Sequence, residues 1–509
     1  MTYLRPILAG IAASALLACT QPQPSDAEIV ALDALALRQE IATGRVSALR
    51  VTQAYLRRIA SLDDSGPRLG AVIEVNPDAE VIARALDERF RSGTIVGPLH
   101  GVPVIVKASI DTADQMATSA GSLALAEHRA RADADVVARL RAAGAVLLGK
   151  ANLSEWANFR SMASTSGWSS LGGQTRNPYV LDRNPCGSSS GSAVAVAARL
   201  APLAVGTETD GSIVCPAAAN GVVGIKPTIG TVSQRGLVPI AHSQDTAGPL
   251  ARTVADAELL LAVLVDPGAL APPPVPVGSV AGLRIGVVRD FHGAGDEPDV
   301  EQSFTATLGW LARAGAVLVD PVEAAFPAAV EEAELAILLA ESHDDLGAYL
   351  ATVQRGPRTL DELIAFNLAH ADEVMPHFGQ ELLLAAHASA GAAGPDYAAA
   401  LETAAAARTA LAALFAEQRL DALVAPVNAR AWRTNLTAGD TFGVSSSGIA
   451  AVSGYPSIAV PVAIANELPL GIALIGKPRE ESQLVALAAA IERQRGSFPE
   501  PRFLPSVED

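Results

Sequence analysis

Short apolar runs alternate with helical stretches along almost the whole chain, and this alternation restricts the possible fold more than any other feature. Runs with the length and composition of buried strands cover residues 99–107, 144–149, 203–206, 222–226, 283–288, 316–319, 420–426, 457–462 and 470–475. Helical patterns lie between them, over 134–143 and 192–198, and most strongly over 328–350 and 397–418. Because neither half is all-helical, the pattern favours one large α/β domain over separate modules.

The composition is that of a folded protein with an acidic surface. Of the 509 residues, 50% are hydrophobic and 18% are charged, so a large buried core is expected. The formal net charge is −17, and such a surface repels phosphate backbones. We therefore expect no nucleic-acid partner, and we attribute the charge to solubility outside the cytoplasm. We also expect no metal ion and no other cofactor.

The first residues resemble a targeting segment. Arg5 precedes a mostly apolar stretch that is too short to span a bilayer, so residues 1–18 are predicted to be a signal peptide. The sequence LLAC that ends at Cys19 resembles the bacterial lipobox, which predicts lipidation of this cysteine and a tether over 19–26. The alternative is an ordinary secretory signal with an incidental cysteine.

The predicted lipobox also predicts a location. The protein is expected to be exported, as a periplasmic or outer-envelope lipoprotein whose only membrane contact is the lipid anchor on Cys19. No later segment is expected to cross a membrane.

The chain after the tether is divided into one domain over 27–495 and a C-terminal tail over 496–509. The proline-rich residues 271–277 are the best internal linker candidate, and helical spacing over 27–62 predicts one or two amphipathic helices.

Lysine is rare, and arginine supplies most of the positive charge. The lysines are Lys107, Lys150, Lys226 and Lys477. Burial can make lysine neutral at ordinary pH, whereas arginine stays charged. Lys107 ends an apolar strand that suits a neutral amine, although a strand-end lysine that reaches solvent is the alternative. Lys150 and Lys226 are expected to pack against or cap strand ends, without a catalytic role.

Cysteine is equally scarce. Cys19, Cys186 and Cys215 are too few for a disulfide framework, so packing is expected to supply the stability. A single bridge between Cys186 and Cys215 is the less favoured alternative.

The first of two serine-bearing segments is CGSSSGS at 186–192. Part of it fits the G-x-S-x-G pattern, centred on Ser189. That pattern requires a strand directly before it, and residues 181–185 have the composition of a loop, so Ser189 is not favoured as a nucleophile. We expect the segment to cap the helix that begins near Ser192. It follows a stretch rich in Ser, Gly and Asn over 154–184, and loops of that length are usually functional.

The second serine-bearing segment directly follows the apolar run 203–206 and ends at Ser212. Small and polar residues after a strand place a hydroxyl at the strand's C-terminal end, where ligands of α/β sheets commonly bind. Gly211 lets the backbone turn, so that successive N–H groups can converge on one point. Glu208 is interpreted as a possible capping group.

These segments together resemble the amidase signature family. The matching motifs are GVPVIVK ending at Lys107, CGSSSGSAVAVAA from Cys186, TETDGSIVCPAAANGVVGIKPT from Thr207, QDTAGPLAR at 244–252 and GYP at 454–456. The similarity covers residues 32–491, and the DGSIVCP variant is most similar to that of the bacterial peptide amidases. The resemblance implies an amidase domain over 27–495, with a mixed, twisted central β-sheet covered by helices on both faces.

The resemblance also implies roles for individual residues. It makes Ser212 the acylated nucleophile, Ser188 the bridging serine in a cis peptide, and Lys107 the base. The implied binding residues are the backbone N–H groups of Thr209, Asp210, Gly211 and Ser212 as an oxyanion hole, and Met162 and Ser164 in the acyl pocket. Two positions depart from the family, since Asp210 replaces its commonest glycine and Val214 a frequent arginine. The lost arginine argues against small dicarboxylate-like substrates.

The predicted reaction is hydrolysis of a carboxylic amide C–N bond through an acyl-enzyme on Ser212, with ammonia released from C-terminal peptide amides. The partner is then a small-molecule or peptide amide, and the protein a monomer or homodimer. One alternative is an amidase for fatty-acid, aryl or small aliphatic amides. Another is a ligand-binding lipoprotein without catalysis. Aminoacyl-tRNA transamidation, which occurs in the family, is disfavoured by the export signal and the acidic surface.

Overall fold

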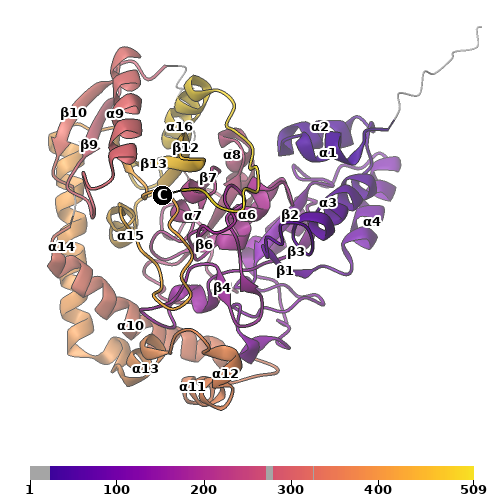
Figure 1. Ribbon diagram of the computed structural model, residues 1–509, viewed down its shortest axis with the longest axis horizontal. Helices are drawn as coiled ribbons and strands as arrows, with labels where there is room; N and C mark the ends of the chain where they lie inside the picture. The colour runs from indigo at the N-terminus through magenta and orange to yellow at the C-terminus, as the bar shows by residue number, and fades with distance from the viewer. Residues whose placement is uncertain (1–22, 271–278, 325, 509) are drawn as a thin grey trace, which may run out of the picture.

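The computed structural model describes residues 23–270, 279–324 and 326–508. The predicted signal peptide, Cys19, and the linker candidate at 271–277 lie outside the described residues. Most strands of the described chain form one mixed central sheet, and the helices surround it (Figure 1). The prediction of a single large α/β domain with helices on both sheet faces is confirmed.

The central sheet has eleven strands in the order β1–β3–β2–β6–β8–β7–β12–β13–β11–β9–β10. These strands are β1 (Val72–Val75), β2 (Pro103–Lys107), β3 (Val146–Ala151), β6 (Leu203–Glu208), β7 (Val223–Lys226), β8 (Thr246–Ala251), β9 (Arg284–Val288), β10 (Val317–Val322), β11 (Ala422–Pro426), β12 (Ser457–Ala465) and β13 (Leu468–Ile475). Neighbours are parallel within β3–β2–β6 and within β11–β9–β10, and antiparallel elsewhere. A separate pair consists of β4 (Trp168–Ser169) and β5 (Gly173–Gln174).

The α-helices are α1 (Asp26–Ala31), α2 (Ala34–Ala42), α3 (Ala48–Leu62), α4 (Ala79–Arg91), α5 (Asp135–Ala142), α6 (Ser190–Ala197), α7 (Val214–Ala219), α8 (Val254–Leu264), α9 (Pro298–Arg313), α10 (Ala328–Leu350), α11 (Leu360–Ala369), α12 (Ala371–Val374), α13 (Glu381–Ala388), α14 (Pro395–Glu417), α15 (Gly448–Ser453) and α16 (Glu481–Arg495). Short 3-10 turns are η1 (Leu123–Leu125), η2 (Glu155–Asn158) and η3 (Gly391–Ala393).

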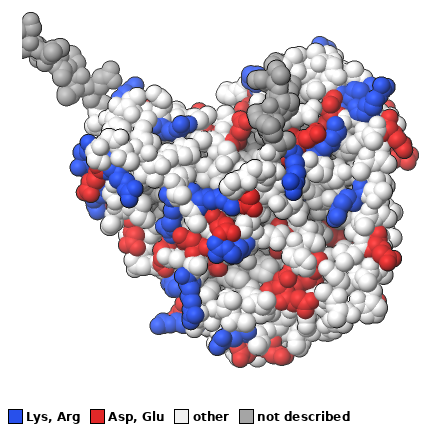
Figure 2. All heavy atoms as spheres, turned by 180° about the vertical axis from the view of Figure 1, so that it is seen from behind, with Lys and Arg blue, Asp and Glu red and all other residues white. Residues whose placement is uncertain are grey.

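Alternation along each central strand divides the core into two layers. In β6, Leu203 and Val205 pack with α5, α8, α9 and α16 on one face of the sheet. Ala204 packs with α6 and α7 on the other face. Successive side chains of a strand point to opposite faces of the sheet. A central strand is therefore apolar on both faces, and helices are needed to cover each face. On the face of the molecule seen in Figure 2, acidic and basic side chains are interspersed.

The long helices α10 and α14 pack against each other at the end of the domain away from α1–α4 (Figure 1). Their contact consists of small and branched apolar side chains, including Ala333, Ile337, Ala404 and Ala407. By length and composition, the alanine-rich α14 is apolar enough to cross a membrane, and 28% of its most apolar window is buried. No such segment was expected from the sequence, but this test is also passed by core helices of soluble proteins.

The sequence-based boundaries differ from the structure in several places, including the N-terminal helices, β1 and β8. Residues 27–62 form three helices rather than one or two, because Asp33 and Ser47 each cap a new helix. β8 was not predicted, since its sequence TAGPLA contains glycine and proline. The C-terminal tail packs on the domain, where the Leu504 carbonyl accepts a hydrogen bond from the Leu181 N–H at 2.8 Å.

Candidate active site

Lys107 is the last residue of β2, and its side chain is entirely buried. Its Nζ lies 2.7 Å from Ser188 Oγ and 2.9 Å from Thr207 Oγ1. Burial lowers the pKa of Lys107 to about 7, and the nearby Asp245 and Glu208 act in the opposite direction. The amine is therefore close to half neutral at neutral pH, so it can accept a proton from a hydroxyl. The alternative of a solvent-exposed strand-end lysine is wrong.

Ser188 lies in the loop that leads into α6, and the Gly187–Ser188 peptide bond is cis. A Cβ atom at Gly187 would lie 2.3 Å from Ser154 Oγ, so this position has room only for glycine. The hydroxyl of the next residue, Ser189, donates to the Thr207 carbonyl at 2.9 Å and accepts from the Thr207 N–H at 3.2 Å. Ser189 therefore ties the loop to β6, in agreement with the expectation that it is not a nucleophile.

Ser212 lies just beyond the end of β6 and lines a large cleft. Its carbonyl accepts a hydrogen bond from the Ser189 N–H at 3.1 Å, which holds the two serine loops together. Gly211 has a φ angle of +74°, and a Cβ atom there would lie 2.9 Å from Ser447 Oγ. Glycine is required for this turn on both counts.

The loop between β6 and α7 presents unused backbone donors. Within the described part of the chain, the N–H groups of Asp210, Gly211 and Ser212 donate to no acceptor, and all three residues line the cleft. Buried N–H groups are normally paired, so a run of unpaired ones beside a hydroxyl suits an oxygen atom that gains negative charge. This is the arrangement expected of an oxyanion hole.

Two buried carboxylates hold this loop in place. Glu208 accepts hydrogen bonds from the N–H groups of Ile213 at 2.6 Å and Val214 at 2.9 Å, so it caps α7 as interpreted from the sequence. Asp245 accepts from Thr209 Oγ1 at 2.5 Å. Asp245 lies in the QDTAGPLAR motif, but no role was predicted for it from the sequence.

The two other buried lysines have structural partners. Lys150 Nζ donates to the Ile110 carbonyl, and Lys226 Nζ donates to the Pro227 carbonyl at 3.2 Å. Burial lowers the pKa of each to about 8. In the hydrogen bonds of the described residues, neither amine contacts a serine of the two motifs, in agreement with the expectation that both pack at strand ends.

Cys186 and Cys215 form a disulfide, with their Cα atoms 6.0 Å apart. Two free thiols were the favoured expectation, and that expectation is wrong. The bridge joins the two serine-bearing loops, because Cys186 lies two residues before Ser188 and Cys215 three residues after Ser212. The presence of one cysteine in each serine motif is a signal that could have pointed to this pairing.

The cleft at Ser212 has a volume of about 760 Å³, which is the size of a site for a small ligand or short peptide. Much of its wall is apolar, and includes Phe291, Phe326, Phe442, Val444 and Ile449. Of the two predicted acyl-pocket residues, Met162 lines the cleft and is largely exposed. Ser164 is buried and is not part of the lining, so its predicted role in the acyl pocket has no support in the geometry.

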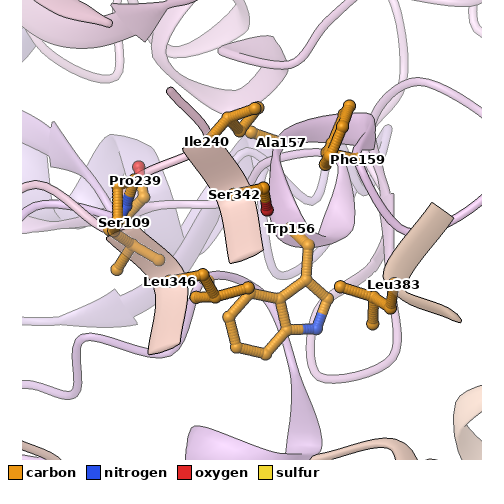
Figure 3. A pocket seen from close by; sticks show the side chains of 11 residues that line it. Ser109, Trp156, Ala157, Phe159, Pro239, Ile240, Ser342, Leu346 and Leu383 are labelled. Carbon is orange, nitrogen blue, oxygen red and sulfur yellow. The ribbon is translucent and has the colours of Figure 1, made fainter. Parts of the chain in front are cut away.

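A second pocket shares only Ala157 with the cleft (Figure 3). It is enclosed by the indole of Trp156 and by Leu346 and Leu383, and its volume is about 10 Å³. A space of this size holds no more than one water molecule. The large cleft is therefore the candidate substrate site.

Comparison with known proteins agrees with this geometry. The family model described as Amidase matches residues 50–485. A probable amidase of Arabidopsis thaliana is 38% identical over 484 residues, which cover 90% of this chain and 89% of the relative. One subunit of the glutamyl-tRNA(Gln) amidotransferase from Salinispora arenicola is 36% identical over 507 residues, with 93% and 99% covered.

Solved structures give a closer match. The native peptide amidase from Stenotrophomonas maltophilia superposes with a TM-score of 0.86 at 47% identity, covering 92% of this chain and 98% of that one. The peptide amidase PAM in complex with the competitive inhibitor chymostatin has a TM-score of 0.88 at 47% identity, covering 92% and 99%. The chain therefore belongs to the amidase signature family, and it is an enzyme that hydrolyses amide C–N bonds.

Proposed function

We propose that this enzyme removes the C-terminal amide nitrogen of peptides and releases it as ammonia, through an acyl-enzyme on Ser212. The observation that carries the proposal is the buried pair of Lys107 and Ser188, 2.7 Å apart, beside the loop that bears Ser212. The similarity to two structures named as peptide amidases supports the choice of substrate.

In the proposed cycle, the Ser212 hydroxyl attacks the amide carbonyl and gives its proton to Ser188, whose own proton passes to Lys107. A serine hydroxyl is a weak nucleophile until a neighbour takes its proton, and a neutral amine can do so. The unpaired N–H groups of Asp210, Gly211 and Ser212 then stabilise the oxyanion, at roughly 3–4 kcal/mol per donor in comparable sites.

The second half of the cycle returns the protons. When the C–N bond breaks, the departing nitrogen takes a proton from Ser188, and Lys107 restores the one that Ser188 has lost. A water molecule then attacks the acyl-enzyme and gives a proton to Ser188 and Lys107. This pair returns the proton to the Ser212 oxygen as the acyl bond breaks, and the peptide leaves with a free carboxyl group. The neutral Ser188 hydroxyl relays protons without a second buried charge, which would be expensive.

The test is ammonia release from C-terminally amidated peptides, simple aliphatic and aryl amides, fatty-acid amides and free glutamine. Wild type is compared with Ser212→Ala and Lys107→Ala. We expect release from the amidated peptides by wild type and none by Ser212→Ala, with a peptidyl adduct on Ser212 trapped by rapid acid quench and mass spectrometry. Activity that survives in Ser212→Ala would contradict the nucleophile assignment.

The same panel separates the competing substrates. Release from aliphatic, aryl or fatty-acid amides alone would favour an amidase of different scope. Release from free glutamine alone would favour the chemistry of the amidotransferase relatives. After either outcome, the residues that form the acyl pocket would be identified again by using the preferred substrate.

We further propose that the enzyme is exported and anchored through a lipid on Cys19. The apolar N-terminal segment and the LLAC sequence support this, and a disulfide between Cys186 and Cys215 suits an oxidising compartment. Metabolic labelling with a radioactive fatty acid tests it, because wild type should take up the label and Cys19→Ala should not. An unlabelled, soluble wild-type protein in the cytoplasm would contradict the proposal.

A further inference from the structure

The ionisable residues that line the cleft are almost all acidic. The carboxylates of Asp210, Asp290, Glu331 and Glu334 line it, and no lysine or arginine does so among the residues that the structure describes. Elsewhere in the chain, acidic residues commonly lie beside arginines, as in the pairs of Arg141 with Asp114 and Asp133. The part of the lining around Asp210, Glu331 and Glu334 therefore gathers acidic groups and includes no lysine or arginine among the described residues.

Two elements bring three of these carboxylates together. Glu331 and Glu334 lie three residues apart near the start of α10, so both point from one side of that helix. Asp210 comes from the loop after β6, two residues before Ser212. Gln244 Nε2 donates to Glu334 Oε1 at 2.7 Å, which holds this carboxylate in position.

The three carboxylates repel one another. Burial and the neighbouring Asp210 raise the pKa of Glu334 to about 8, and Glu331 adds to the effect, so this carboxyl group mostly carries a proton at neutral pH when no cation is near. Burial also raises the pKa of Asp210, whose side chain is open to the cleft, while a hydrogen bond from Ser447 lowers it and Glu331 adds to the rise. Lys226 partly offsets the charge on Asp210, but it is entirely buried outside the lining and also faces Glu208. A ligand cation in the cleft would relieve the remaining repulsion.

A further acceptor lines the same cleft. Asn428 is only 4% exposed, and its Oδ1 atom has no hydrogen-bond partner within the described part of the chain. Its Nδ2 is already used, because it donates to the Ala429 carbonyl at 3.0 Å. An unpaired buried acceptor costs free energy that a ligand donor can recover. The lining therefore offers three carboxyl groups and one amide side chain to a ligand that brings N–H donors.

We propose that this acidic part of the cleft, formed by Asp210, Glu331, Glu334 and Asn428, is a subsite for an ammonium group of the substrate. An ammonium group has three donors and one positive charge, which suits the oxygen atoms of three carboxyl groups. In a short amidated peptide, the ammonium is either the free α-amino group or a lysine side chain. This inference rests on the proposed function, because it places the cation on the same molecule whose amide reaches Ser212.

The test compares three peptide amides that differ in their positive charge. They are alanyl-leucinamide, its N-acetylated form, and N-acetyl-lysyl-leucinamide. Their dissociation constants are measured by calorimetry with Ser212→Ala enzyme, so that no turnover is needed. We expect the free-amine peptide to bind about tenfold more tightly than its acetylated form, from two or more partly solvated charge pairs. The lysyl peptide shows which of the two ammonium sources the subsite accepts.

Variants locate the effect on the subsite. In the Ser212→Ala background, Glu331→Gln should reduce the preference for the cationic peptide about fivefold, because one partly solvated charge pair is lost. Glu332→Gln is the matched control, since Glu331 and Glu332 are both exposed neighbours on the same helix but only Glu331 lines the cleft. It removes the same charge from the protein and should leave the preference unchanged.

Two outcomes would overturn the inference. One is equal binding of all three peptides, and the other is an equal loss of preference in Glu331→Gln and Glu332→Gln, which would indicate only the overall acidic field. Turnover by wild type is followed separately through ammonia. If none of the peptides releases ammonia, the proposed peptide-amide function fails, while the calorimetry still decides whether the ammonium subsite exists.

Discussion

Lys107 and Ser188 are 81 residues apart in the chain, and their Nζ and Oγ atoms lie 2.7 Å apart in a site shielded from solvent. The contact joins the end of β2 to the loop before α6, and β2 and β6 lie side by side in the sheet. Because Ser189 ties this loop to β6, which pairs with β2 in the sheet, Lys107 and Ser188 are already in place to pass a proton. The predictions below concern this pair and the elements that hold it.

Replacement of Lys107 by methionine should abolish most of the activity without unfolding the protein. A general base contributes roughly 10²- to 10⁴-fold to the rate, so kcat should fall by that amount. Lys150→Met is the matched control, because Lys150 is equally buried but its Nζ donates to the Ile110 carbonyl and not to Ser188. Ammonia release measures both variants, and near-normal kcat in Lys107→Met would contradict the assignment of the base.

The same variant should change how stability depends on pH. Burial lowers the pKa of Lys107 from 10.5 in the unfolded chain to about 7 in the folded one. The folded protein therefore carries an unfavourable buried charge below pH 7, and this penalty disappears as the pH rises toward 10.5. Thermal unfolding of Lys107→Met should thus show a gain in stability at low pH that shrinks through this window. A gain that does not vary with pH would contradict the lowered pKa.

The rate of wild type should depend on pH in the same range. Only neutral Lys107 can accept the proton, so kcat/KM should fall about tenfold per pH unit below the pKa of about 7 and level off above it. The measurement is ammonia release over about pH 5 to 9, which extends about two pH units on either side of the expected midpoint. Each rate is corrected for the stability of the enzyme at that pH. A flat profile would exclude an essential group with this pKa.

Thr209→Val should damage the oxyanion loop. The substitution keeps the shape but removes the donor to Asp245, so a buried carboxylate loses a partner, at a cost of about 1–3 kcal/mol in unfolding free energy. We expect kcat to fall about tenfold as the loop relaxes. This fall is smaller than the one caused by removing an oxyanion donor, because the substitution keeps all the N–H groups of the loop. Denaturant unfolding and ammonia release measure the two effects. Thr209→Ser restores the hydroxyl and should restore both.

Loss of the disulfide should weaken the fold. The bridge between Cys186 and Cys215 closes a segment with a sequence separation of 29, and loops of this size contribute about 3–4 kcal/mol through the unfolded state. The double variant Cys186→Ala/Cys215→Ala should lose this much, measured by denaturant unfolding. Wild type should become less stable on addition of a reductant, and the double variant should not respond. Equal stability of wild type with and without reductant would contradict the bridge.

Most strands and long helices were predictable, because periodicity is a local property. The helix predicted over 328–350 has the same bounds as α10, and the apolar run 457–462 lies within β12. The placement of Lys107 at a strand end and of Ser212 after a strand also follows from local pattern. β8 was missed because its glycine and proline hide the apolar alternation of a central strand.

The sequence by itself therefore determined the class of fold, the order of the serine and lysine motifs, and the chemistry these residues are able to perform. Only the tertiary structure decided that Cys186 pairs with Cys215, that Ser164 lies outside the cleft, and that Glu331 and Glu334 line the same cleft as Asp210. The physical reason is distance along the chain. Local patterns specify helices and strands, but the order of strands in the sheet decides which remote side chains share one low-dielectric site, and there their pKa values are set.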